Sequence, residues 1–91
     1  MKVKNLHGTS DKTCDKCKSW LKHWENKTND STWFCMKKDC TNKATVGAHV
    51  IKCEGHDKKF YIVPLCHSCT KKKEEFELEP YAELAPAIAC E

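Results

Sequence analysis

Two closely spaced pairs of cysteines constrain this chain more than any other feature of its sequence. Four residues separate Cys35 from Cys40, two separate Cys66 from Cys69, and 25 lie between the two pairs. Each spacing suits a tight turn that points two sulfur atoms inward, and two such turns brought together supply the four thiolates of a tetrahedral zinc site. The sequence therefore predicts a zinc centre formed by these four cysteines.

The chain has few large apolar residues with which to build a core. Leu, Ile, Val and Phe account for 15 of its 91 residues. That fraction lies below the roughly 20% at which a charged chain struggles to fold unaided. A structural zinc ion contributes on the order of 10 kcal/mol to the folding of small metal-binding domains. We therefore expect bound zinc to supply much of the stability of this chain.

The eight cysteines also raise the alternative of a disulfide scaffold. Against it, the N-terminal residues lack the apolar segment of a secretory signal, and no apolar run approaches the ~20 residues of a membrane span. The Cys-x2-Cys spacing favours metal or redox chemistry over long-loop cross-links. We therefore expect a cytoplasmic zinc protein without a membrane partner, with disulfides or a thiol redox role as the alternatives.

Hydrophobic periodicity predicts the elements that lie between these turns. Residues 18–26 have helical spacing, with Trp20, Leu21 and Trp24 on one face. Residues 46–63 contain two β-branched and aromatic runs around a polar turn, which is typical of a β-hairpin. Together with the cysteine turns, these elements predict a small α+β zinc-binding domain.

The remaining segments complete the expected organisation. Residues 70–78 favour a helix that directs Phe76 inward. The apolar residues of 81–91 predict a tail that packs back against the domain. Residues 1–13 are polar and aperiodic, so we expect an extended arm followed by one domain over residues 14–91.

The order of cysteine turn, hairpin, cysteine turn and helix over about residues 33–78 is that of a treble-clef zinc finger. Within this frame, the segment Gly47-Ala48-His49-Val50 and the segment from Tyr61 to Cys69 resemble the HNH nuclease motif on its zinc-bearing ββα-metal fold. The resemblance implies a histidine general base on the first strand, here His49, and a catalytic divalent ion separate from the structural zinc.

The sequence departs from the HNH pattern at three positions. Ala48 stands where the family has an Asp or His ligand, and Thr70 stands where it has His or Asn. No asparagine occurs between Cys53 and Cys69. Because a hydrolytic ion needs oxygen or imidazole ligands, we expect a degenerate HNH-like site with no catalytic residue. An active HNH-type endonuclease that uses His49 is an alternative.

Four further cysteines, of which Cys14 and Cys17 have ligand spacing, raise the prospect of a second zinc ion. The expected ligands are Cys14, Cys17 and Cys90, with His23, His49, Cys53 or His56 as the fourth. If His49 is that ligand, it cannot serve as a general base.

The whole chain is also similar to small uncharacterised bacterial and phage zinc proteins. The shared features are an Asn-x2-Gly-Thr segment at residues 5–9 and a Ser-Trp-x2-His-Trp segment at residues 19–24. This resemblance implies one compact unit that includes the tail, and it implies no activity.

Charge is distributed unevenly along the chain. Residues 1–73 hold all 16 lysines and seven acids, a net charge of +9, whereas residues 74–91 hold six glutamates and no lysine. A basic body favours polyanion binding, which an acidic tail could screen. There is no arginine, which argues against specific base readout. The lysines within or beside the zinc-finger frame are Lys37, Lys38, Lys43, Lys52, Lys58, Lys59, Lys71, Lys72 and Lys73.

These patterns lead to a non-catalytic zinc module that binds nucleic acid through a lysine-rich face. The alternative from a different class is a zinc-stabilised protein-interaction module. Its contact surface would come from Trp33, Tyr61, Phe76 or the apolar tail. The oligomeric state is left open by the sequence.

Overall fold

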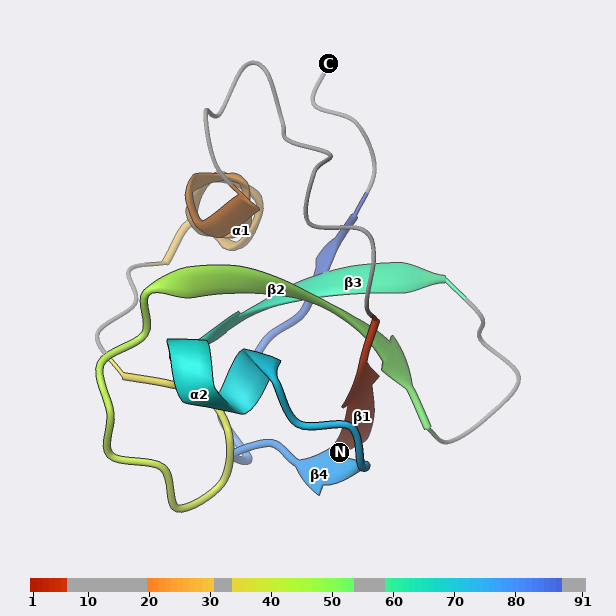
Figure 1. Cartoon of the computed structure of the whole chain (residues 1–91). Coiled ribbons are helices and arrows are strands. Elements are labelled where there is room, and N and C mark those ends of the chain that lie inside the picture. Colours follow the sequence, from red (N-terminus) through yellow and green to blue (C-terminus); the bar gives the residue numbers. More distant parts are fainter. Residues whose placement is uncertain (7–19, 31–33, 54–58, 88–91) are drawn as a thin grey trace.

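The described part of the chain forms one antiparallel sheet with two helices (Figure 1). The computed structural model describes residues 1–6, 20–30, 34–53 and 59–87. The strand order in the sheet is β4-β1-β2-β3-β5. The strands are β1 (Lys2–Asn5), β2 (Val46–Lys52), β3 (Phe60–Leu65), β4 (Phe76–Glu77) and β5 (Ala85–Pro86), and the helices are α1 (Trp20–Thr28) and α2 (His67–Thr70).

The hairpin of β2 and β3 is the centre of the sheet and confirms the sequence prediction. Its register runs from Val46 opposite Leu65 to Ile51 opposite Phe60. Ile62 and Val63 are both fully buried, because the two faces of β3 are covered by different parts of the chain. β-branched side chains are well suited to such a strand.

The N-terminal residues belong to this sheet, which differs from the expected arm over residues 1–13. Strand β1 pairs with β2 on one side and with β4 on the other. Val3 is fully buried and Asn5 is 4% exposed, so alternate side chains of β1 enter the core. Two inward residues are too few to stand out as a period in the sequence. Residues 7–13 lie outside the described part of the chain.

The helix predicted over residues 70–78 is wrong. Helix α2 ends at Thr70, and the chain then forms β4, which pairs with β1. Phe76 and Leu78 are buried at alternate positions, which is the period of a strand. The lysines that begin this segment and the glutamates that end it also oppose the helix dipole. The inward direction of Phe76 is confirmed.

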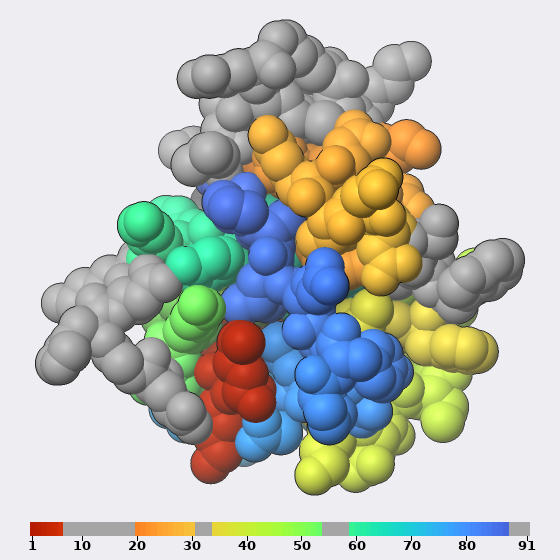
Figure 2. Space-filling model, turned by 180° about the vertical axis from the view of Figure 1, so that it is seen from behind, coloured from red at the N-terminus to blue at the C-terminus, as the bar shows by residue number. Residues whose placement is uncertain are grey.

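Helix α1 and the C-terminal segment pack on the same side of the hairpin. Figure 2 shows the segment that contains β5 (blue) between β1 (red) and α1 (orange). The indole nitrogen of Trp24 donates to the carbonyl oxygen of Glu83 at 2.8 Å, and β5 pairs with β3. Ala85 is 1% exposed. The predicted packing of the tail is therefore confirmed up to Ala87, and residues 88–91 lie outside the described part.

Gly47 sets how closely α1 can approach the sheet. A Cβ atom at this position would lie 2.4 Å from both the backbone nitrogen of Leu21 and the carbonyl carbon of Trp20. The first turn of α1 therefore rests directly on the backbone of β2. Because the obstructing atoms are backbone, no side-chain rotation could relieve the overlap.

We expect Gly47→Ala to displace α1 and to lower the free energy of unfolding by more than about 2 kcal/mol. Urea unfolding of the zinc-loaded protein, followed by tryptophan fluorescence, measures this loss. Lys27→Ala, on the exposed side of α1, should change stability by less than about 0.5 kcal/mol. Equal stabilities of the two variants would contradict the close approach.

Candidate metal centre

Four cysteine sulfur atoms meet at the end of the sheet where β3 leads into α2. The Sγ atoms of Cys35, Cys40, Cys66 and Cys69 all lie within 4.8 Å of one another. The distance from Cys40 to Cys66 is 3.9 Å and from Cys40 to Cys69 is 3.8 Å. Zinc–sulfur bonds of about 2.3 Å in a tetrahedron give sulfur separations of about 3.8 Å. The four thiols are thus spaced for one shared ion, and the predicted convergence of these residues is confirmed.

The first cysteine turn is shaped by backbone hydrogen bonds. The amide of Cys40 donates to the carbonyl oxygen of Lys37 at 3.0 Å. Asp39 adopts a φ of 65° within this turn, a left-handed conformation that aspartate tolerates better than most residues. The Asp39 amide also donates to a carboxylate oxygen of Glu79 at 2.9 Å. The acidic segment after β4 therefore supports the metal-binding turn.

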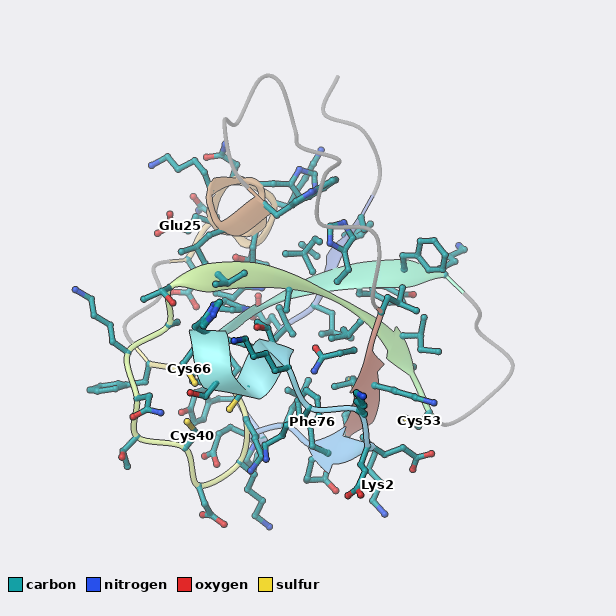
Figure 3. The ribbon with its side chains drawn as sticks, viewed as in Figure 1. Lys2, Glu25, Cys40, Cys53, Cys66 and Phe76 are labelled. Carbon is teal, nitrogen blue, oxygen red and sulfur yellow. The ribbon has the colours of Figure 1, made fainter. Side chains whose placement is uncertain are left out.

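The second turn joins the end of β3 to the start of α2. Cys66 precedes the helix, and its carbonyl oxygen accepts from the amides of Cys69 and Thr70 at 3.1 and 3.2 Å. The two turns are also tied together, because the amide of Met36 donates to the carbonyl oxygen of Pro64 at 3.0 Å. Figure 3 shows Cys40 and Cys66 close together next to α2.

The environment of the thiols differs from one cysteine to the next. Cys35 is fully buried, Cys66 and Cys69 are 5% exposed, and Cys40 is half-buried. Burial raises the pKa of Cys35, and burial together with the neighbouring thiols raises that of Cys69. Burial also acts most strongly on Cys66, but hydrogen bonds to its sulfur, from Asn42 first, lower its pKa to about 6. The lowered pKa favours the thiolate form of Cys66, which is the form that binds a metal ion.

Two asparagines support the site, and sequence reasoning missed both. The side-chain nitrogen of Asn42 lies 3.6 Å from the Cys66 sulfur, to which it donates. The side-chain nitrogen of Asn5 donates to the carbonyl oxygens of Cys69 and Lys72, at 2.8 and 3.0 Å. Asn5 thereby links β1 to the end of α2. Since Asn5 lies 64 residues from Cys69, only the tertiary fold reveals this contact.

His23, in α1, and His49, in β2, face each other across the contact between the helix and the hairpin, on the side away from the four cysteines. The Trp20 ring contacts both His23 and His49 edge-on, at centroid distances of 5.0 and 4.6 Å. Nε2 of His23 lies 2.8 Å from the carbonyl oxygen of Pro86. Burial, and then the charge of His23, lowers the pKa of His49. Both effects favour the uncharged form of the His49 ring, which packs against Trp20.

Cys53, which was also predicted as a ligand for a second zinc, lies beyond the end of β2, away from these histidines. The Cys53 amide donates to the carbonyl oxygen of Lys2, and Figure 3 shows Cys53 and Lys2 on the same side of the domain. Cys53 is the fourth residue after His49 along the extended chain, a distance of about 13 Å. Cys14, Cys17, His56 and Cys90 lie outside the described residues.

The structure divides the predicted lysines between the two ends of the hairpin. Lys52 and Lys59 flank its turn, and the Lys52 ammonium lies 4.7 Å from the centre of the Tyr61 ring. Lys58 lies outside the described residues.

The other lysines lie in or next to the two cysteine turns. Three of these, Lys37, Lys72 and Lys73, line a shallow hollow together with Glu74, Glu75 and Glu77. The acidic segment therefore offsets part of the positive charge near the metal centre.

The sequence matches no protein-family model, and neither the curated proteins nor the solved structures contain a significant match to it. None of the helices in the described residues is long and apolar enough to cross a membrane. The assignment of this site therefore depends on its own geometry.

We expect Asn42→Ala to weaken zinc binding about tenfold, the lower end of the effect of losing a hydrogen bond to a metal ligand. Competition with a chromophoric zinc chelator measures this change. Asn42 is exposed, so the substitution should leave the fold intact. Thr41→Ala, at the exposed neighbouring position, is the matched control, and equal zinc affinities for both variants would refute the role of Asn42.

Proposed function

We propose that this chain is a non-catalytic, zinc-binding module of treble-clef type that contacts nucleic acid through the lysines of its cysteine turns. The four-sulfur cluster carries the zinc-binding part of this proposal. The succession of cysteine turn, hairpin, cysteine turn and short helix supports the treble-clef part. Helix α2 has only four residues, which is shorter than the helix expected from the resemblance to HNH proteins.

The surroundings of His49 support a module without nuclease activity. Trp20 contacts the His49 ring, which leaves less room there for water and a scissile phosphate. Thr70 donates its hydroxyl hydrogen to the carbonyl oxygen of His67 at 2.6 Å, and Ala48 offers no ligand atom. Within residues 1–6, 20–30, 34–53 and 59–87, no second group of three or more metal-binding side chains comes together. In this part of the chain, three ligands for a catalytic ion therefore do not come together beside His49.

The lysines favour contact with phosphate groups over base readout. Lys38, Lys43 and Lys71 are exposed on or next to the cysteine turns, and the chain has no arginine for bidentate contacts to guanine. Binding through such lysines is sequence-independent and falls steeply with salt. Because Lys52 and Lys59 lie at the other end of the hairpin, the proposed lysine face consists of the lysines on or next to the cysteine turns.

A protein-interaction module is the second candidate, and three exposed aromatic side chains favour it. Phe34, Phe60 and Tyr81 are 59%, 51% and 63% exposed. Phe76, which the sequence suggested as a contact residue, is 7% exposed and cannot form such a surface. Trp33 lies outside the described residues. The three exposed rings come from different segments of the chain.

We expect the zinc-loaded protein to shift labelled DNA or RNA in a gel at low salt, without cleaving it when Mg²⁺, Mn²⁺ or Ni²⁺ is added. Raising the salt should abolish the shift, because released counterions drive such binding. Removal of zinc by a chelator should also abolish it. No shift at low salt would favour the protein-interaction module, and cleavage that disappears in His49→Ala would establish the nuclease.

We also propose a second zinc ion, held by Cys14, Cys17 and Cys90 with His23 or His49 as the fourth ligand. Both imidazoles contact Trp20, which follows Cys17 by three residues. Three trans peptide units span at most about 11 Å, so Cys17 is within reach of both histidines. Cys53 is less suitable because it lies at the other end of β2.

Native mass spectrometry tests this second site directly. We expect two zinc ions on the intact chain, one on Cys17→Ser and two on Cys53→Ser. A single zinc ion on the intact chain, with Cys14 and Cys17 freely alkylated, would refute the second site and leave the first unaffected.

A further inference from the structure

We propose that Phe34 and Lys43 form a binding platform for single-stranded nucleic acid, in which a base stacks on Phe34 and the Lys43 ammonium contacts the adjoining phosphate. This inference rests on the proposed nucleic-acid function and specifies its ligand class. The platform consists of these two side chains alone.

The two residues lie side by side on neighbouring segments. Phe34 and Lys43 are antiparallel bridge partners, and the amide of Cys35 donates to the carbonyl oxygen of Asn42 at 2.8 Å. Cross-strand partners have Cβ atoms about 5 Å apart on the same face. Since Cys35 and Ala44 are buried, the side chains of Phe34 and Lys43 point outward, and both are exposed.

The Phe34 ring is 59% exposed, so it lacks the burial that usually stabilises a phenylalanine side chain in a fold. The charge of the residues around it complements a nucleic-acid ligand. The loop 34–43 contains Lys37, Lys38 and Lys43 but only one acid, Asp39. Stacking on an exposed aromatic next to basic side chains is the common mode of sequence-tolerant binding to single strands.

The metal centre holds this platform in place. Cys35, which follows Phe34, is one of the four clustered cysteines, and Asn42, which precedes Lys43, donates to the sulfur of Cys66. Each residue of the platform is therefore the chain neighbour of a residue that belongs to the cysteine cluster or donates to it. A preformed platform loses less conformational entropy on binding, so we expect its affinity to depend on the metal.

Phe60 provides a matched control within the same chain. It is 51% exposed and lies at the start of β3, opposite Ile51 and away from the cysteine turns. Lys59, exposed beside it, is the corresponding control for Lys43. A general contribution of exposed rings or of positive charge would affect both ends of the hairpin equally.

The experiment measures fluorescence anisotropy of labelled oligothymidylate and of a duplex of equal length, titrated with zinc-loaded protein. We expect Phe34→Ala to weaken binding of the single strand by roughly 5- to 100-fold, with little effect on the duplex, in which bases are not free to stack. Phe60→Ala should bind both probes like the unmodified chain. Phe34→Trp keeps an aromatic ring at this position and should retain single-strand binding.

Lys43→Gln tests the phosphate contact. We expect it to lower the slope of log affinity against log salt by about 0.7 for the single strand, whereas Lys59→Gln leaves the slope unchanged. Equal zinc content of all variants excludes an indirect effect on the metal centre. If the unmodified chain binds neither probe, the proposed function itself fails. If it binds and Phe34→Ala behaves like Phe60→Ala, the function stands and the platform is refuted.

Discussion

Four sulfur atoms converge on one point at the end of the central hairpin, and the packing around them depends on what they bind. Cys35, Cys66 and Cys69 belong to the same buried cluster as Val3, Trp24 and Ile62. Three of the four clustered cysteines are therefore part of the hydrophobic core. Burial favours the neutral form of Cys35 and Cys69, and thiols without an ion attract one another only weakly. A zinc ion bound by these four thiols would convert the cluster into a cross-link between two turns, which would stabilise a chain with so few large apolar residues.

The features that the sequence predicted well are those with a local signal. The short spacings of Cys35 to Cys40 and of Cys66 to Cys69 report a tight turn directly, and the β-branched runs around Val46 and Ile62 report strands. Helix α1 was also expected, since its apolar residues repeat over two turns. Local sequence patterns mispredict a segment whose structure depends on a pairing partner far away in the chain. The segment after Thr70 is rich in lysine and glutamate, which favour helices, yet pairing with β1 makes part of it a strand.

Residues that support the metal site without binding it gave no signal at all. Asn5 holds the second cysteine turn through two hydrogen bonds and Asn42 through one, and neither stands at a spacing that marks a ligand. Asn5 lies in a segment that reads as an unstructured arm because only Val3 and Asn5 point inward. The close approach of α1 to Gly47 is equally hidden, although a glycine within a strand pattern often marks such a contact.

The position of β1 also has a consequence for the order in which the domain forms. This strand precedes the other described elements in the chain, yet it pairs with β2 and with β4, and Asn5 caps a helix turn that follows Cys66. A ribosome-bound chain that has exposed both cysteine turns could bind zinc and close the hairpin while β1 still lacks its outer neighbour. Contacts between segments so far apart in sequence form slowly. We therefore expect metal capture to precede completion of the sheet, and the pairing of β4 with β1, which joins the strands farthest apart in sequence, to be a late step of folding.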